Sequence, residues 1–311
     1  MLGIVAKSTG SWYTVLLENE QRIECRMRGQ QRLQDSQNTN PIAVGDKVEI
    51  DIDTDTNTGS IQAIADRKNY IIRNAGGKTP KTHVIAANID QCFLMVTLHT
   101  PHTTKGFINR FLVTAEAYEV PTVLLFNKTD LLDDKELKEL EEFIYIYELA
   151  GYTCIKLSAI KPDKQVKKIV DMMKGKINLL SGNSGVGKST FMNAIDPLLN
   201  LKTGNISNFN NKGIHTTTFA EMFELKNKGF LIDTPGIKGF GLTAMAKAEL
   251  SHYFPEMRGL LNQCKFDNCL HFNEPKCAVK NAVDEGKIHE SRYLSYLSML
   301  HDEEDFKKFY D

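Results

Sequence analysis

A phosphate-binding motif occupies residues 182–189, where Gly182, Gly187, Lys188 and Ser189 fit the pattern G-x-x-x-x-G-K-[ST]. In this motif the glycines let backbone amides surround the phosphates at the start of a helix, whose dipole favours negative charge. The lysine reaches the β and γ phosphates, and the serine hydroxyl binds Mg²⁺. A chance glycine-rich turn would lack the apolar run before this motif and the helix-compatible segment after it. The residues predicted to contact the nucleotide here are Gly182, Asn183, Ser184, Gly185, Val186, Gly187, Lys188, Ser189 and Thr190.

The base is selected by Asn127-Lys128-Thr129-Asp130, which directly follows the apolar run 122–126 and fits the guanine-recognition motif N-K-x-D. The Asp130 carboxylate can accept hydrogen bonds from both N1–H and N2–H₂ of guanine. Adenine offers no such pair of donors and would leave the carboxylate unpaired. Lys128 would lay its aliphatic stem on the base, and Asn127 would tie loops together. The motif therefore favours GTP, and an ATPase is a distant alternative.

Two shorter elements complete a GTPase set. Asp233-Thr-Pro-Gly236 fits D-x-x-G, whose aspartate acts on Mg²⁺ through water and whose glycine amide senses the γ phosphate. Ser158 and Ala159 fit the S-A element that backs the guanine, although alone they could be a simple strand end. All four elements follow apolar runs, so we expect them to meet where strands of a sheet end. The sequence thus predicts a GTPase site that holds GTP or GDP with Mg²⁺.

The order of these elements is circularly permuted. Ordinary small GTPases begin with the phosphate loop, whereas here N-K-x-D and S-A precede it, and a threonine-rich loop at 213–218 and D-x-x-G follow it. A permutation is tolerated when the original termini lie close together at the surface. Because the D-x-x-G loop leads almost directly into the C-terminal region, we expect the nucleotide state to act on that region.

The residue that activates water is not the usual one. Small GTPases often place a glutamine directly after D-x-x-G, but this chain has Ile237 there, so low intrinsic turnover and an activating partner are expected. His215 is the candidate substitute, because an imidazole can orient or deprotonate water near neutral pH. The alternative is a surface histidine without a catalytic role. One of the threonines at 216–218 is expected to meet Mg²⁺.

A cluster near the C-terminus has metal-ligand spacing. Cys264, Cys269, His271 and Cys277 supply three thiolates and one imidazole, the ligand set of a closed tetrahedral Zn²⁺ site. Four protein ligands leave no open position, so the ion would be structural. A redox pair or an iron–sulfur site is disfavoured by the histidine and the spacing. The other three cysteines are expected in the core; they are Cys25, Cys92 and Cys154.

These motifs require three kinds of element around them. Residues 1–68 contain about five short strand-like runs without a helical period, which indicates an OB-fold-like β-barrel, with another small β domain as the alternative. Residues 69–241 alternate apolar strands with helical segments, which predicts a central α/β P-loop GTPase domain with a mostly parallel sheet. Residues 242–311 are expected to form a mainly helical zinc-binding domain.

Charge and composition limit the class of protein. With 38 basic and 39 acidic residues, the net charge of −1 argues against a bulk nucleic-acid coat. The segment 67–83 nevertheless carries five positive charges and no acid, which predicts an RNA-backbone contact or, alternatively, a solvated linker. No run of about 18 apolar residues exists, and the N-terminus does not predict a secretory signal. We therefore expect a protein in the reducing cytoplasm, away from membranes. We also expect it to act as a monomer.

The combination resembles a known family over nearly the whole chain. The permuted order, the N-terminal barrel, the segment 86–91 and the Cys/His cluster resemble the ribosome small-subunit-dependent GTPase A family. The resemblance implies a GTPase that acts in late maturation of the small (30S) ribosomal subunit, is stimulated by it, and contacts its rRNA. It also implies a catalytic histidine before the threonine run, at His215. The alternative function is a GTP-regulated adaptor that binds a protein partner, with hydrolysis incidental.

Overall fold

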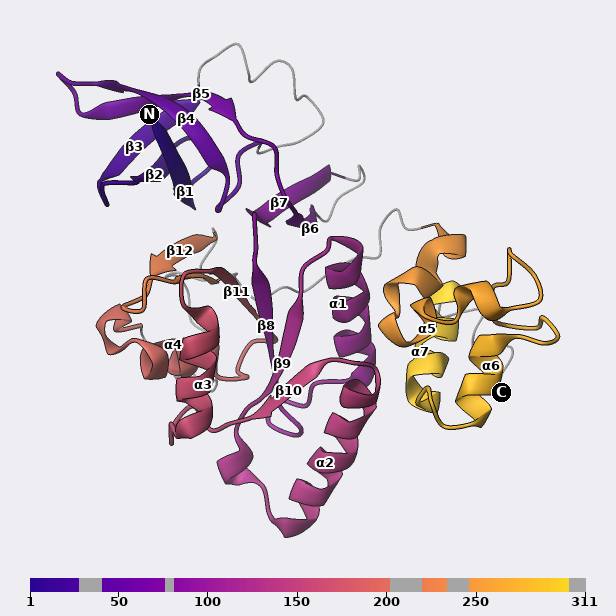
Figure 1. Cartoon of the computed structure of the whole chain (residues 1–311). Helices are drawn as coiled ribbons and strands as arrows, with labels where there is room; N and C mark the ends of the chain where they lie inside the picture. Colours follow the sequence, from indigo (N-terminus) through magenta and orange to yellow (C-terminus); the bar gives the residue numbers. More distant parts are fainter. Residues whose placement is uncertain (28–40, 76–80, 202–219, 234–245, 302–311) are drawn as a thin grey trace.

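The computed structural model describes residues 1–27, 41–75, 81–201, 220–233 and 246–301. Figure 1 shows an N-terminal barrel, a central sheet with helices on both faces, and a cluster of helices beside α1 that carries the C-terminus. Within the part of the chain that is described, no helix combines the length and the apolar character that a membrane crossing requires.

The N-terminal barrel is closed by five strands. Its strand order is β1-β2-β3-β5-β4, and β4 pairs back with β1. Alternate residues point inward, so Ile23 and Cys25 of β3 and Val48 and Ile50 of β4 are buried in one apolar cluster. This confirms the predicted OB-fold-like barrel. The strands are β1 Leu2–Ser8, β2 Tyr13–Leu17, β3 Arg22–Met27, β4 Lys47–Asp53 and β5 Thr58–Ile64.

The central sheet has the order β10-β9-β8-β11-β13-β12. All neighbouring pairs are parallel except β12 and β13. Strands β8 and β11 are buried along their whole length, as strands covered on both faces must be. The predicted α/β domain with a mostly parallel sheet is therefore confirmed. Its strands are β8 Gln91–Val96, β9 Thr122–Phe126, β10 Thr153–Lys156, β11 Ile177–Ser181, β12 Glu221–Glu224 and β13 Phe230–Asp233.

Helices α1 and α2 cover one face of this sheet, and α3 and α4 cover the other (Figure 1). Along β8, Leu94 and Val96 face the core under α1 and α2, whereas Phe93 and Met95 face the core under α3 and α4. The chain leaves the parallel strands β8, β9, β10 and β11 at the same edge of the sheet and then enters a helix, so the loops after these four strands gather at that edge. The helices are α1 Lys105–Ala117, α2 Asp134–Leu149, α3 Lys164–Met173 and α4 Lys188–Ile195.

The basic segment 67–83 is not a linker, and that alternative was wrong. Strands β6 Tyr70–Ala75 and β7 Lys81–Ala87 pair as an antiparallel hairpin. Two of its five charges are also engaged within the chain. Arg67 donates from Nε to the fully buried Asp46 carboxylate at 2.7 Å, and the Lys68 ammonium lies 3.3 Å from Asp90. Burial of Asp46 requires a cation beside it, which the spacing of charges along the sequence does not reveal.

The barrel is joined to the central sheet by strand pairing. Strand β1 pairs antiparallel with β12 at Lys7 and Glu221, whose side chains also form an ion pair of 3.2 Å. Asn88 donates to the Gly45 carbonyl at 2.9 Å. Gly45 has φ +92°, and a Cβ there would clash with the Ala87 carbonyl, so only glycine fits this joint. Barrel and central sheet thus form one continuous sheet of 11 strands.

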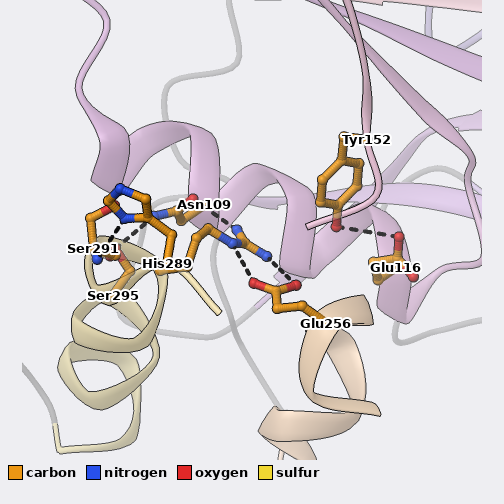
Figure 2. A network of polar contacts seen from close by, with 8 residues as sticks. Asn109, Glu116, Tyr152, Glu256, His289, Ser291 and Ser295 are labelled. Atoms are coloured by element: carbon orange, nitrogen blue, oxygen red, sulfur yellow. Dashed lines mark hydrogen bonds and ion pairs between the residues drawn. The ribbon is translucent and has the colours of Figure 1, made fainter. Parts of the chain in front are cut away.

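The C-terminal helices pack against α1 through a buried polar network, drawn in Figure 2. Arg292 is 0% exposed and donates from Nε to Glu256 at 2.7 Å and from Nη1 to Asn109 of α1 at 2.8 Å. Asn109 in turn donates to Ser295 at 2.6 Å. Buried hydrogen bonds therefore dock this region on α1. Its elements are η5 Lys247–Tyr253, α5 Pro255–Arg258, η6 Leu261–Gln263, α6 Ala278–Asp284 and α7 Glu290–Leu300.

Candidate nucleotide site and metal centre

The phosphate loop lies between β11 and α4, and its glycines have backbone conformations that favour glycine. Gly182, Gly185 and Gly187 have φ values of +145°, +83° and +102°. A Cβ at Gly182 would clash with the Met95 carbonyl, and one at Gly187 with the Asn127 amide. No side chain caps the N-terminus of α4, so the amides of its first turn are available to an anion.

Lys188 and Asp233 are two opposite charges at this loop, close enough to affect each other's pKa. The Lys188 ammonium donates to the carbonyls of Gly182 at 2.7 Å and Asn183 at 3.0 Å. Burial lowers the pKa of Lys188, and the charge of Asp233 partly opposes that effect. Burial raises the pKa of Asp233 to about 6, against the opposing influence of Lys188. The ammonium is thus held where phosphate oxygens would replace loop carbonyls as its acceptors.

The environment of Asp233 fits a hard cation. Its Oδ1 atom is buried and has no hydrogen-bond partner among the described residues. A desolvated carboxylate oxygen without a partner is costly, and oxygen ligands of this kind suit Mg²⁺ carrying water and phosphate. Ser189 lies in the first turn of α4 and would offer its hydroxyl to the same ion. The residues present therefore fit the metal that accompanies a nucleotide.

Asn127 links the base-reading loop to the two other loops. Its side-chain amide donates to the Val186 carbonyl at 2.8 Å, and its Oδ1 accepts from the Ala159 amide at 2.9 Å. The Thr129 hydroxyl donates to the Leu157 carbonyl at 3.1 Å, which fixes the short helix η2 Thr129–Leu131 beside the end of β10. The N-K-x-D, S-A and phosphate loops are therefore held together by hydrogen bonds between residues up to 59 positions apart.

The three loops enclose one cavity of about 180 Å³. Asp130 and Lys128 lie in its wall, which places an acceptor for a base edge beside an aliphatic stem for a base face. The sequence did not single out Leu131 and Ile160, which are 61% and 64% exposed at the rim. The available signal in the sequence was their position, since Leu131 directly follows the N-K-x-D motif and Ile160 directly follows the S-A element. The cavity is lined by Asn127, Lys128, Asp130, Leu131, Ala159, Ile160, Gly187 and Thr190.

Some expected site residues lie outside the described part of the chain. The predictions for water activation, for the threonine that meets Mg²⁺ and for the γ-phosphate sensor fall on such residues. These residues are His215, Thr216, Thr217, Thr218, Gly236 and Ile237. Asp233, where β13 ends, is the described part of the D-x-x-G element.

The four C-terminal metal-ligand candidates converge on one point. Their ligand atoms all lie within 4.8 Å of one another. The sulfurs of Cys264 and Cys277 lie 3.5 and 3.4 Å from His271 Nδ1 and 4.0 Å from each other. Tetrahedral Zn²⁺ with bonds of about 2.0–2.3 Å separates its ligand atoms by roughly 3.5–3.8 Å. The donor set and the spacing therefore fit a four-coordinate zinc ion with no open position.

Neighbouring groups hold the metal loop in shape. The Glu274 carboxylate accepts from the amides of Leu270 and Phe272, each at 2.9 Å. The Tyr293 hydroxyl of α7 donates to the His271 carbonyl at 2.7 Å. These contacts fix the backbone around His271, which lies between the two donor amides and bears the third contact.

The remaining cysteines belong to the core, as predicted. Cys25 and Cys92 are fully buried, and Cys154 packs partly buried against the central core. Burial raises the pKa of Cys25 to about 11 and that of Cys154 to about 12. Both thiols therefore stay protonated at neutral pH and are poor nucleophiles.

Comparisons with known proteins agree with this geometry. The family model of the RsgA N-terminal domain matches residues 2–61, and that of the RsgA GTPase matches residues 64–243. A protein of Bacteroides fragilis strain YCH46, called small ribosomal subunit biogenesis GTPase RsgA, is 51% identical, with 99% of this chain and 98% of the relative covered. A relative of the same name from Phocaeicola vulgatus is also 51% identical over 99% of this chain and 98% of its own.

Two solved structures share the fold over almost the whole length. YjeQ from Thermotoga maritima has a TM-score of 0.78 and 35% identity, with 97% of both chains covered. YloQ, described as a circularly permuted GTPase, has a TM-score of 0.74 and 28% identity over 99% of this chain and 95% of its own. The permuted motif order, the closed barrel and these matches agree, and the chain belongs to the RsgA GTPase family as a circularly permuted GTP hydrolase.

Proposed function

We propose that this chain hydrolyses GTP in late maturation of the small (30S) ribosomal subunit, and that this subunit stimulates hydrolysis. Close relatives are called small ribosomal subunit biogenesis GTPases, and this chain is about half identical to them over almost its whole length. The observation that carries it is the convergence of the phosphate, N-K-x-D and S-A loops on one cavity. The protein would act as a cytoplasmic monomer, with units at 1–68, 69–241 and 242–311.

The nucleotide would lie across the three loops. Residues 182–190 would hold the phosphates, with Lys188 as the cation and Ser189 and Asp233 toward Mg²⁺. Asp130 would read the guanine edge, while Ser158 and Ala159 back it. The guanine–Asp130 contact supplies base selectivity, and the buried charges under the phosphate loop supply the electrostatic stabilisation.

The Cys/His cluster would hold one structural zinc ion. The converging donor atoms and the outer contacts of Glu274 and Tyr293 support this assignment. The metal would give the C-terminal unit its core, and that unit would contact the subunit's rRNA together with the barrel. Arg67 and Lys68 are already paired within the chain, so any phosphate contact falls to other basic residues.

Ribosomal subunits provide the direct test of the proposal. Purified small subunits are expected to raise the GTP turnover of this protein, whereas large subunits and free RNA are not. His215 is proposed to orient the attacking water, because Ile237 replaces the usual glutamine. The stimulated rate of His215→Ala should therefore fall with GTP affinity unchanged. Equal turnover with and without small subunits would favour the alternative, a GTP-regulated adaptor for a protein partner.

Base selectivity is tested by Asp130→Asn. Two hydrogen bonds from guanine to a charged acceptor would be lost or weakened, so GDP and GTP affinity should fall by about 10²-fold. Xanthine nucleotides, whose altered edge suits an amide, should bind better to the variant than to the unchanged protein. Nucleotide titration measures both effects. Asp134→Asn, at the exposed start of α2 and outside the cavity, is the matched control. Unchanged guanine preference in Asp130→Asn would contradict the assigned base site.

A further inference from the structure

Lys128 is anchored by a loop that none of the nucleotide motifs includes. Its backbone is left-handed, with φ +65°, and its ammonium donates to the Thr100 carbonyl at 2.6 Å. Thr100 lies between β8 and α1, in the segment 97–103. A long lysine side chain loses considerable rotamer freedom when its end is fixed, so a single well-placed acceptor determines where its aliphatic stem lies.

The segment 97–103, here called the anchor loop, is itself held by its threonines. The Thr97 hydroxyl donates to the Pro101 carbonyl, and the Thr97 amide donates to the Thr103 hydroxyl at 3.2 Å. The Thr103 amide returns a bond of 3.0 Å to the Thr97 carbonyl. Thr97 and Thr103 are 1% and 0% exposed. Two buried hydroxyls therefore fix the turn that presents the Thr100 carbonyl.

Lys128 lines two neighbouring cavities, as do Asn127 and Leu131. One is the cavity of about 180 Å³ that contains Asp130. The other is a smaller cavity of about 70 Å³, which the anchor loop lines together with Asn127, Lys128 and Glu136. If the ammonium lost its acceptor, the side chain would have room to turn toward the smaller cavity and away from the larger one. The position of the Thr100 carbonyl thus controls where the Lys128 side chain lies, and with it one wall of the larger cavity.

We infer that the anchor loop is a positioning device for guanine-nucleotide binding, with Thr97 as its key residue. The inference rests on the proposed role of Lys128 in contacting the base. Thr97 orients the carbonyl that holds the ammonium, and the held ammonium places the lysine stem along the base face. Among the described residues, no hydrogen bond joins the anchor loop to the phosphate loop or to Asp233. Its effect therefore falls on nucleotide affinity, equally for GDP and GTP.

Thr97→Val tests this inference, because it keeps the shape of the side chain and removes the hydroxyl. GDP and GTP dissociation constants, measured with a fluorescent nucleotide, should both rise about three- to tenfold, the loss of one buried hydrogen bond. Turnover at saturating GTP should change less than twofold. Thr97→Ser keeps the hydroxyl and should restore affinity. Thr114→Val is the matched control, since Thr114 is also 1% exposed and its hydroxyl bonds the Arg110 carbonyl in α1.

A double-mutant cycle separates positioning from general destabilisation. Lys128→Met keeps the stem and removes the ammonium, so it should weaken GDP by a similar factor, and Thr97→Val should add almost nothing in that background. Additive losses would overturn the inference. Wild-type affinity in Lys128→Met would also overturn it, and that measurement does not depend on whether Thr97→Val folds. Failure of the unchanged protein to prefer guanine nucleotides would instead overturn the proposed function itself.

Discussion

Replacing Lys188 with alanine is expected to lower kcat/KM for GTP hydrolysis by about 10²–10³-fold, the usual effect of removing one fixed charge or donor from developing negative charge. The ammonium is the half-buried cation of the phosphate loop, bonded to the carbonyls of Gly182 and Asn183. Phosphate oxygens would take the place of those carbonyls. Without the lysine, the loop amides alone would meet the β and γ phosphates. Steady-state and single-turnover hydrolysis assays measure the loss.

The same substitution has a stability readout that separates catalysis from folding. Lys188 is desolvated, which lowers its pKa, so its removal takes a costly charge out of the protein. The thermal midpoint of Lys188→Ala should therefore stay within a few degrees of the wild-type value. Lys167→Ala, an exposed lysine on α3, is the matched control and should hydrolyse GTP normally. A Lys188→Ala protein that retained a third of the wild-type kcat/KM would refute this role.

Removing the proposed zinc ion is expected to unfold much of the region 246–301. Structural zinc contributes about 10–16 kcal/mol of apparent binding free energy in small zinc domains, comparable to the whole stability of a typical domain. Cys277 is 2% exposed and packs in the core of this region beside Val279 and Leu297. Chelation or Cys277→Ser should therefore abolish hydrogen-exchange protection there, while β11 and α4 stay protected.

A second consequence of zinc loss should appear in α1. Arg292 is fully buried between Glu256 and Asn109, and unfolding of α7 would remove it from this interface. Asn109 would lose its hydrogen bonds to both Arg292 and Ser295. Hydrogen-exchange protection should therefore fall along the face of α1 that contacts the C-terminal region. The control is Cys154→Ala, which removes a thiol far from the cluster and should leave one zinc ion per chain. Equal protection in metal-free and zinc-bound protein would contradict a structural role for the metal.

Much of the candidate site could be read from short spacings. The phosphate loop and the Cys/His cluster each lie within one local segment, so the residue types and their separation fix which groups can face one ligand. Alternation in β3 and the apolar runs of β8 and β11 likewise reveal the burial of those strands. The helical spacing of Val166, Ile169 and Met173 also marks the buried face of α3.

Other features depended on partners distant in the chain. Arg67 and Lys68 belong to a sequence segment with no acidic residue, but in the folded chain Asp46 and Asp90 lie beside them. The linker alternative for 67–83 failed because β6 and β7 pair with each other. Local spacing carries no information about which distant group neutralises a charge, since desolvation and pairing depend on how the elements pack.

The sequence by itself determined the GTPase family, the permuted order of its motifs and which Cys and His residues form the cluster that could hold a metal ion. Only the tertiary structure decided that the C-terminal region docks on α1 through Arg292, that the barrel continues the central sheet, and that the anchor loop holds Lys128. The physical reason is separation along the chain. Each motif lies on one loop, so its residue types and spacing can be read from the sequence. Arg292 and Asn109, in contrast, lie 183 positions apart and meet only when the core has formed.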